Sequence, residues 1–317
     1  MNGITICGTG SALPENCLNN NDLTVMVDTS DEWITSRTGI KNRHIAKNET
    51  TAELAALAAQ RAIENSKINN NEIGLIIVAT FTPDYFTPST ACLVQSKLGL
   101  NDVPLAAFDI NAACSGFVYA LTVAGSMMMQ NPDKYALVIG SEIVSKTIDY
   151  NDRSTCILFG DGAGAVVLKH KDNARLISYL DSSGNKDILN APICDRRSGT
   201  VSPPLKMNGS EVYQFAVETI PKCITNVLEQ AKCTLEQVRF IICHQANSRI
   251  LASAAQRLGI KPDLFVTNLE RVGNTSAASI PLLLDEMNRD GLLVRGDKII
   301  MAGFGGGLTW GSVLLEW

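Results

Sequence analysis

One plan occurs twice along this chain: a short apolar strand, a loop, and a helix that ends in Leu-Gly. In the first half it reads GLIIVAT followed by STACLVQSKLG, and in the second half it reads RFIICHQANSRILASAAQRLG. A strand, a glycine-rich turn and another strand also recur, as ALVIGSE with FGDGAGAVVL and as KIIMAGFGGGLTWGSVLL. Both echoes indicate duplication of one α/β unit, although buried strands of shared composition can also resemble each other.

Short apolar runs alternate with helical patterns throughout the chain. The runs are residues 75–79, 136–139, 240–243 and 298–301. We expect each to be a buried strand, because β-branched runs of this length are too short for helices. Thr50 and Glu53 resemble a capping box, which predicts a helix running to about Asn65. This alternation predicts an α/β fold with helices packed on sheets.

The chain is long enough for two packed halves, with 317 residues of which 45% are hydrophobic. Residues 171–208 contain prolines, glycines and few apolar runs, and they are therefore expected to form an irregular connection. We place the first half at residues 1–170 and the second half at residues 171–317.

The charge and the apolar runs limit the partners that this chain can have. Its 27 basic and 32 acidic residues give a net charge of -5, so we expect no nucleic-acid partner. No stretch of about 18 uninterrupted apolar residues occurs, and the N-terminus lacks a signal pattern. The expectation is a cytoplasmic protein with no membrane partner.

The nine cysteines are an odd number and include no CxxC pair, so neither a disulfide framework nor a metal site is indicated. Most are expected to be small buried apolar residues. Cys114 differs, because an apolar strand ends near Asp109 and a helical pattern begins almost at once. A thiol near a helix N-terminus is expected to have a lowered pKa and to act as a nucleophile. A buried cysteine at a tight turn is the alternative.

Only three histidines occur: His44, His170 and His244. His170 lies in the charged run KHKD, and His44 has no obvious catalytic neighbours. His244 leaves the apolar strand FIIC directly into the polar HQAN, and catalytic side chains commonly lie at such strand ends. A structural histidine is equally compatible with this context.

Two further segments are unusual. Asn274 lies in GNTSAAS, where it could be a turn residue, a helix cap or a catalytic amide. The run GFGGG contains three consecutive glycines, which allow backbone N-H groups to be aimed at a ligand. A tight hairpin explains the glycines equally well.

Taken together, these segments resemble the ketoacyl synthase III family of thiolase-like condensing enzymes. The segments that carry the resemblance span the chain and are DEWITSRTGIKNRH, DINAACSGF, FGDGAGA, HQAN, GNTSAAS and GFGGGLTWGS. The resemblance implies a thiolase-like five-layered αβαβα fold from two duplicated halves and a homodimer. It also implies the first condensation of type II fatty acid synthesis, in which an acyl-CoA primer is joined to malonyl-acyl carrier protein.

The resemblance also implies roles for individual residues. Cys114 is the acyl-accepting nucleophile, and His244 with Asn274 assists decarboxylation by donating to the enolate oxygen. The backbone N-H groups of Cys114 and Gly306 form the oxyanion hole. Phe304 packs beside the malonyl group. Coenzyme A enters as a substrate, so no cofactor is expected.

For coenzyme A, the resemblance implies that Trp33 and an arginine sandwich the adenine and that Arg37 meets phosphate. The coenzyme-binding residues implied in full are Thr29, Trp33, Arg37, Arg153, Gly209 and Asn247. For the acidic carrier protein, the helix of residues 247–258 offers Arg249 opposite its apolar stripe and Arg257 on the flank. Gln214 and Gln256 stand at positions that are often basic in the family, so we expect either a weaker carrier affinity or a differently arranged basic patch. An ordinary solvated face is the alternative for these arginines.

Thr87 lies before Pro88, where short-chain members of the family often have phenylalanine. That side chain closes the acyl pocket from the partner subunit, so threonine predicts a deeper channel and primers longer than acetyl. Phe86, one residue earlier, could instead fill the gap.

Three other functions are compatible with parts of the pattern. A thiolase or a hydroxymethylglutaryl synthase shares the fold and the nucleophile, but GNTSAAS and GFGGGLTWGS argue against both. A condensing enzyme of a secondary, polyketide-like pathway is a second alternative. A non-catalytic scaffold subunit is the third, and the intact Cys114, His244 and Asn274 argue against it.

Overall fold

The computed structural model describes residues 3–172, 174–192 and 203–317. Its first sheet has the strand order β1-β7-β6-β4-β5. The strands are β1 (Ile4–Ala12), β4 (Ile73–Ala79), β5 (Ala106–Ile110), β6 (Tyr135–Glu142) and β7 (Gly162–His170). β4 runs parallel to β5 and β6, whereas β7 runs antiparallel to β6 and β1. The central strands β4 and β6 are buried along almost their whole length, as their apolar runs predict.

The second sheet repeats this arrangement, with the order β8-β13-β12-β11. Its strands are β8 (Leu176–Asn185), β11 (Phe240–Cys243), β12 (Lys298–Gly305) and β13 (Gly307–Glu316). β11 and β12 are parallel, and β13 is antiparallel to both of its neighbours, as in the corresponding part of the first sheet. A parallel bridge between Ile241 and Phe265 lies where the fifth strand would follow. The shared order confirms the predicted duplication.

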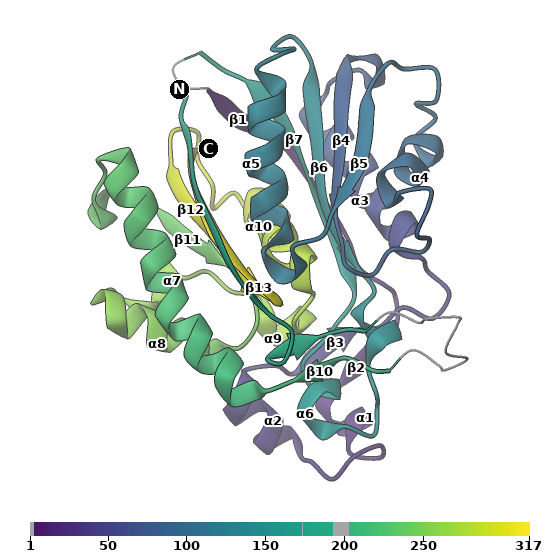
Figure 1. The fold of residues 1–317 in the computed structure, drawn as a ribbon, viewed down its shortest axis with the longest axis vertical. Helices are drawn as coiled ribbons and strands as arrows, with labels where there is room; N and C mark the ends of the chain where they lie inside the picture. Colours follow the sequence, from purple (N-terminus) through teal and green to yellow (C-terminus); the bar gives the residue numbers. More distant parts are fainter. Residues whose placement is uncertain (1–2, 173, 193–202) are drawn as a thin grey trace.

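Helices cover both sheets and fill the space between them (Figure 1). They are α3 (Thr51–Ser66) and α4 (Thr90–Lys97) outside the first sheet, α5 (Gly116–Met128) and α10 (Ser279–Arg289) in the centre, and α7 (Gly209–Ala231) and α8 (Ser248–Leu258) outside the second sheet. Three separate apolar clusters join these layers, and the central one contains residues of both sheets and of both central helices. This arrangement confirms the predicted five layers.

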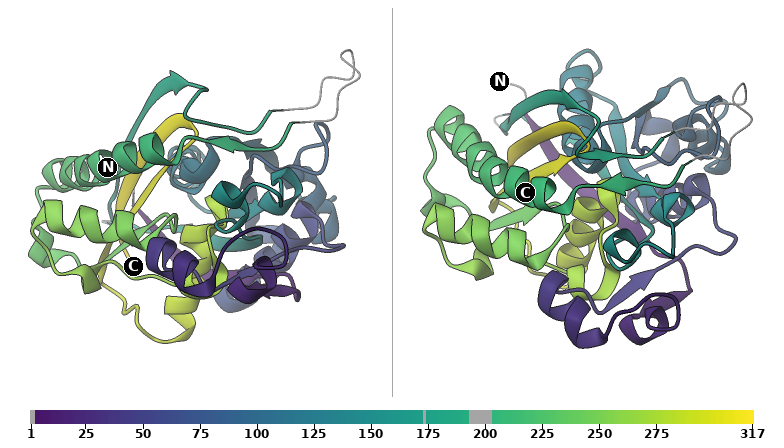
Figure 2. Two further views of the ribbon diagram at one scale, coloured as in Figure 1. Left: turned by 90° about the horizontal axis from the view of Figure 1, so that it is seen from below. Right: turned by 60° about the horizontal axis from the view of Figure 1, so that its bottom comes forward.

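Small elements cover one end of the layers, at the bottom of Figure 1 and toward the viewer in the left view of Figure 2. They are α1 (Asn20–Leu23), α2 (Asp31–Thr38), α6 (Arg153–Cys156), α9 (Leu269–Val272), the pair β2 (Cys17–Asn19) and β3 (Asn42–His44), and the pair β9 (Leu189–Asn190) and β10 (Lys206–Met207). Within the described residues, no helix combines the length and the apolar run needed to cross a membrane.

Several local predictions are confirmed. The Thr50–Glu53 capping box begins α3, which ends at Ser66, and the four apolar runs all lie in strands. The prediction of an irregular connection at residues 171–208 is wrong for β8, a full member of the second sheet. β8 lies at the edge of its sheet, and most of its side chains are only partly buried, so its sequence lacks an apolar run. The division into halves at residue 170 stays a prediction.

The cysteines follow the predicted burial only in part. Cys156, Cys223 and Cys243 are buried. Cys17 and Cys92 are exposed, so the expectation of burial is wrong for them, because both lie on the outer faces of short surface elements. Cys194 lies outside the described residues.

Candidate active site

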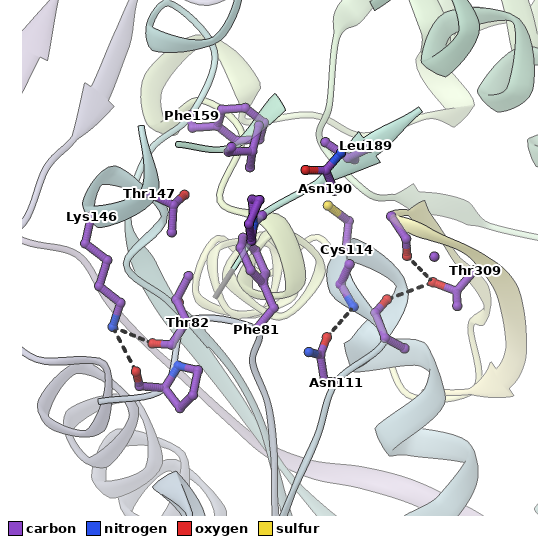
Figure 3. A pocket seen from close by; sticks show the side chains of 18 of the residues that line it. Phe81, Thr82, Asn111, Cys114, Lys146, Thr147, Phe159, Leu189, Asn190 and Thr309 are labelled. Carbon is purple, nitrogen blue, oxygen red and sulfur yellow. Dashed lines mark hydrogen bonds between the residues drawn. The ribbon is translucent and has the colours of Figure 1, made fainter. Parts of the chain in front are cut away.

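Cys114 lies in a single 3-10 turn, η2 (Ala113–Ser115), directly before α5. The turn is held by the Asn111 side chain, whose Oδ1 accepts the N-H of Ala113 at 3.2 Å (Figure 3). Only 6% of Cys114 is exposed. The sulfur is therefore held at the N-terminal end of a central helix, as the sequence predicts.

The glycine-rich turn packs directly against this cysteine. A Cβ on Gly305 would lie 2.9 Å from the Cys114 Cβ, and one on Gly303 would lie 2.9 Å from the Ser115 Cα. Such distances are too short for real Cβ atoms, so only glycine allows the approach. Thr309 adds a hydroxyl that donates toward the carbonyls of Ala112 at 2.9 Å and Gly306 at 3.0 Å. The backbone of residues 303–306 thus forms a wall of the site.

His244 follows β11 and is 1% exposed. Burial lowers the pKa of the imidazole to about 3, so the ring is neutral near pH 7. The Phe304 ring packs edge-on against it, with 5.2 Å between the ring centroids. Phe304 thus lies beside His244, and its packing beside a malonyl group stays a prediction.

Ser279 contacts the inner nitrogen of this ring. Its Oγ lies 2.8 Å from His244 Nδ1 and donates to the Ser276 carbonyl at 2.8 Å. A hydroxyl has one hydrogen, so with this bond made Nδ1 is the donor and Nε2 is left as an acceptor. The predicted donor role of His244 requires the Ser279 hydroxyl to turn and donate to Nδ1 instead.

Asn274 is 6% exposed and follows Gly273, which has a φ of 67°. Its backbone bonds to Leu158 and Gly160, at 2.9 Å in each case. Its side-chain Oδ1 accepts the N-H of Ser276 at 3.0 Å. Because the amide oxygen is fixed in this way, Nδ2 is the group that the side chain can offer to a ligand. Asn274 is thus both a turn residue and a candidate amide donor.

Two cavities meet at Cys114. The first, of about 560 Å³, has Cys114, His244, Asn274 and Phe304 among its lining residues together with Trp33, Arg37, Gly209, Asn247 and Arg249. The second cavity has a volume of about 970 Å³ and shares Cys114 with the first. Its lining also includes Gly306, Thr87, Phe81, Phe159 and Leu189, of which the last three are labelled in Figure 3. The sulfur is thus reachable from a channel that begins near Trp33 and from a largely apolar chamber.

The predicted low thiol pKa is wrong for the free protein. Burial raises the pKa of Cys114 to about 12, the Ser276 hydroxyl lowers it, and the Glu142 carboxylate raises it further. The loss of hydration is the largest of these effects and outweighs the hydrogen bonds that favour a thiolate. Cys114 therefore holds its proton before a substrate arrives.

Two residues beside the sulfur, Ser276 and Glu142, were not predicted from the sequence. The Ser276 Oγ lies 3.3 Å from Cys114 Sγ and 3.2 Å from Glu142 Oε1. Ser276 is part of GNTSAAS, where it was indistinguishable from a helix start. A signal for Glu142 was present, because a carboxylate that closes the apolar strand ALVIGSE needs buried partners.

The predicted adenine sandwich is closed in this structure. The guanidinium carbons of Arg37 and Arg153 lie 4.8 Å and 4.7 Å from the centroid of the Trp33 ring. Arg153 also donates to the Asp28 carbonyl at 2.6 Å. Cation–π attraction holds both guanidinium groups against the indole, so a purine that binds here has to displace one of them.

The other predicted coenzyme residues have distinct positions. Asn247 caps α8 by accepting the N-H of Arg249 at 2.8 Å, and it donates to the Arg37 carbonyl at 3.0 Å. Gly209 begins α7 and lines the channel. Thr29 precedes α2 and is absent from the channel lining, and its buried hydroxyl has no partner.

The residues predicted for the carrier protein lie on α8. Arg249, Gln256 and Arg257 are all on its outer side, and Ile250, Leu251, Ala254 and Ala255 form the buried stripe. Arg249 is the one of the three that also lines the channel.

Thr87 lines the second cavity and is exposed, next to Phe86, which is 80% exposed. Phe86 also lines this cavity, so the deeper channel and the alternative in which Phe86 fills the gap both stay predictions.

Comparisons with known proteins agree with this geometry. The family model described as 3-oxoacyl-[acyl-carrier-protein (ACP)] synthase III matches residues 108–184, and its C-terminal counterpart matches residues 228–317. A beta-ketoacyl-[acyl-carrier-protein] synthase III of Clostridium acetobutylicum is 50% identical over 100% of this chain and 99% of the relative. A protein of the same name from Neisseria gonorrhoeae is 52% identical over 98% of each chain.

A solved structure is also similar. The crystal structure of 3-oxoacyl-[acyl-carrier-protein] synthase III from Aquifex aeolicus VF5 has a TM-score of 0.92 and 45% identity, covering 99% of this chain and 100% of that one.

Proposed function

The chain belongs to the beta-ketoacyl-[acyl-carrier-protein] synthase III family, and we propose that its Cys114 carries the acyl group during condensation. The resemblance found in the sequence is thereby confirmed, and the protein is a condensing acyltransferase. The individual substrates and residue roles that follow are our proposals.

The observation that carries the proposal is the position of one sulfur on two cavities. The channel from Trp33 suits an extended thioester arm, and the largely apolar chamber suits an acyl chain. A primer on coenzyme A would place its carbonyl at the junction, where Cys114 attacks it. The backbone N-H groups of Cys114 and Gly306 would stabilise the tetrahedral oxyanion.

Decarboxylation would follow on the channel side. A malonyl group on the carrier protein would reach the same junction, where Nδ2 of Asn274 and Nε2 of His244 donate to the enolate oxygen. The edge of Phe304 beside the imidazole disfavours a charged carboxylate there and so favours loss of neutral carbon dioxide. The carbanion then attacks the acyl group on Cys114.

Recognition of the carriers is proposed at the channel mouth. Arg37, Trp33 and Arg153 would bind the nucleotide end of coenzyme A, with Thr29, Gly209 and Asn247 along its path. Arg249 and Arg257, with Gln256 between them on the outer side of α8, would meet the acidic carrier protein. Coenzyme A acts as a substrate here, and the proposed chemistry needs no bound cofactor.

A homodimer is supported by the edge of the first sheet. β5 is the terminal strand of that sheet, so its outer backbone groups have no neighbouring strand among the described residues. Tyr85 and Phe86, in the loop that precedes α4, are 59% and 80% exposed. A second copy would cover this edge and bring its own Thr87 and Phe86 to the neighbouring chamber.

A cytoplasmic location is a further proposal. The eight cysteines that the structure describes are all free thiols, which persist best in a reducing compartment.

Covalent loading tests the proposed function. We expect intact-protein mass spectrometry with acyl-CoA to find one acyl adduct on the wild type and none on Cys114→Ala. His244→Ala should load but fail to condense with malonyl-acyl carrier protein. Cys92→Ala, an exposed cysteine away from the site, is the matched control and should load normally. Full condensation by His244→Ala would overturn the role of the imidazole.

Chain-length preference tests the role of Thr87. A threonine leaves room in the chamber, so we expect butyryl- and octanoyl-CoA to load at least as fast as acetyl-CoA. Thr87→Phe should reduce octanoyl loading more than acetyl loading. A strict acetyl preference of the wild type would remove the idea of a deeper channel.

A further inference from the structure

A fully buried carboxyl lies behind the nucleophile and has no role in the chemistry described above. Glu142 closes β6 and is 0% exposed. Among the described residues, no basic side chain forms an ion pair with it. A carboxyl in such a place is costly unless its oxygens are well bonded or carry a proton.

The two oxygens of Glu142 share the Phe81 N-H, which lies 3.3 Å from Oε1 and 3.2 Å from Oε2, but they differ in their hydroxyl partners. Oε2 accepts the hydroxyls of Thr82 at 2.5 Å and Thr80 at 3.1 Å, and the N-H of Thr82 at 3.2 Å. Oε1 faces the hydroxyl of Ser276, 3.2 Å away. Both oxygens thus contact the loop after β4, and Oε1 also faces Ser276 in the active site.

Ser276 bridges this second oxygen and the sulfur. Its Oγ lies 3.3 Å from Cys114 Sγ, but its single hydrogen can be given to only one neighbour. When Glu142 is ionised, donation to the carboxylate is the stronger bond. Ser276 Oγ then accepts the thiol hydrogen, and the order is Sγ–H to Oγ–H to Oε1.

We propose that Ser276 and Glu142 form a proton relay that removes the thiol proton of Cys114 during acyl transfer. Ser276 touches the reacting sulfur and is a catalytic residue in this scheme, whereas Glu142 acts through it as a positioning residue. The inference rests on the proposed function, because it names the proton acceptor for the same nucleophile.

The step balances in protons and electrons. Sγ gives its proton to Ser276 Oγ, which passes its own proton to Glu142 Oε1, and the sulfur electron pair forms a bond to the acyl carbon. The bond from that carbon to the coenzyme sulfur then breaks. The leaving thiolate takes up one proton, which restores ionised Glu142.

The acidities suit a transient relay. Burial raises the pKa of Glu142 to about 7, so near neutrality the carboxyl can both accept and release a proton. The pKa of Cys114 is raised to about 12, so the thiol keeps its proton until a carbonyl is attacked. His244, linked through Ser279 and the Ser276 carbonyl, is neutral at this pH.

One other charged group lies beside the relay. Lys146 donates to the Thr82 carbonyl at 2.6 Å and lies 3.5 Å from Asp84 (Figure 3). It therefore contacts the same loop as Glu142, at a backbone carbonyl next to the Thr82 hydroxyl.

The two possible roles of Glu142, structural or proton-accepting, predict opposite changes in the alkylation rate of Cys114 when Glu142 is neutralised. Its negative charge raises the pKa of Cys114. If it only anchored the loop, its neutralisation would make the thiol more acidic and faster to alkylate. If it accepts the proton, its neutralisation makes alkylation slower.

The experiment is the rate of Cys114 alkylation by iodoacetamide from pH 6 to 9, followed by mass spectrometry. We expect the wild-type rate to rise through about pH 7 and then level off, following Glu142. Glu142→Gln should be at least about tenfold slower at pH 8 and lack that inflection. Ser276→Ala should show the same loss of rate and of inflection. The double variant should be alkylated no more slowly than either single variant, because both residues act in the same relay.

Asp161→Asn is the matched control, because Asp161 is also buried and bonded to a serine hydroxyl and backbone N-H groups, away from Cys114. It should keep the wild-type pH profile. A Glu142→Gln rate equal to or above the wild type would overturn the relay, as would a wild-type rate in Ser276→Ala. If Glu142→Gln does not fold, Ser276→Ala carries the test, since it leaves the carboxyl and its loop contacts in place.

Alkylation needs neither acyl-CoA nor a carrier protein, so it separates this inference from the proposed function. If the alkylation rates follow the expected pH profiles but acyl-CoA leaves no adduct on Cys114, the relay is supported and the proposed function is rejected. An acyl adduct on Cys114 with unchanged profiles would do the reverse.

Discussion

At the residue scale, Ser279 decides which nitrogen of His244 carries the proton. Its hydroxyl can donate to the Ser276 carbonyl or turn to the imidazole, and both oxygen-to-partner distances are 2.8 Å. Only the second arrangement gives Nε2 a hydrogen to donate to an enolate oxygen while the ring stays neutral. The proposed decarboxylation step therefore depends on Ser279, which lines neither of the two cavities.

Replacing Ser279 tests this dependence. Ser279→Ala removes the group that can donate to Nδ1, so we expect condensation to slow by about tenfold, the value of one hydrogen bond of about 1.4 kcal/mol. Loading of Cys114 should be unchanged, as measured by mass spectrometry beside steady-state condensation. Ser312→Ala is the control, because Ser312 is equally buried but donates to the Cys223 carbonyl away from the site. Equal rates for both variants and the wild type would contradict the prediction.

Local sequence context singled out Cys114 before a central helix and His244 directly after an apolar strand, whereas Asn274 follows α9 and was singled out by the family resemblance. It could not supply the acidity of the thiol. That value depends on burial by residues far along the chain, such as Gly305, which no local pattern reports. Ser276 was missed for the same reason, since its contact with Glu142 joins residues 134 positions apart, whereas the carboxylate at the end of the apolar strand ALVIGSE was a local signal that was overlooked.

At the element scale, the turn between β12 and β13 determines how closely backbone can approach the nucleophile. A Cβ added at Gly305 would lie 2.9 Å from both the backbone nitrogen and the Cβ of Cys114. Gly184 in β8 offers a contrast, because a Cβ there meets nothing within 4 Å. Comparing alanine substitutions at Gly305 and Gly184 therefore distinguishes a clash in the active site from the general effect of adding a methyl group to a strand.

Gly305→Ala should push the turn away from η2 and misplace the oxyanion-hole donors. We expect acyl loading to fall by about a hundredfold, the usual loss when an oxyanion donor is removed. Unfolding in denaturant should show a loss of about 1 to 3 kcal/mol from overpacking. Gly184→Ala, measured in the same way, should retain its loading rate. Normal loading by Gly305→Ala would show that the close approach is dispensable.

The elements that sequence reasoning identified were the ones with strong periodicity. The buried strands β4, β6, β11 and β12 carry continuous apolar runs, and α3 carries a capping box. β8 was missed because an edge strand needs no such run, and its partner β13 supplies the register. Trp33 lines the channel, and its contacts with Arg37 and Arg153 depend on α6 packing beside α2, which no local pattern reports.

At the scale of the whole molecule, the open edge of the first sheet and the exposed Phe86 point to a second copy of this chain. A charge placed in a covered apolar contact is costly, so Phe86→Glu should weaken association. Val25→Glu is the matched control, because Val25 is 86% exposed but follows α1, outside the loop of Phe86 and the edge strand β5. Sedimentation velocity should find a dimer for the wild type and Val25→Glu and a larger monomer fraction for Phe86→Glu. A wild-type monomer at micromolar concentration would reject the dimer.

The meeting of two cavities on one sulfur also sets an order of events. Coenzyme A and the malonyl arm would both enter through the channel near Trp33, while the acyl chain on Cys114 occupies the apolar chamber. Coenzyme A would have to leave the channel before the malonyl arm enters it. We therefore expect a double-displacement mechanism without a ternary complex. Double-reciprocal plots at several fixed concentrations of the second substrate would then be parallel lines, and spent coenzyme would compete with the carrier for entry.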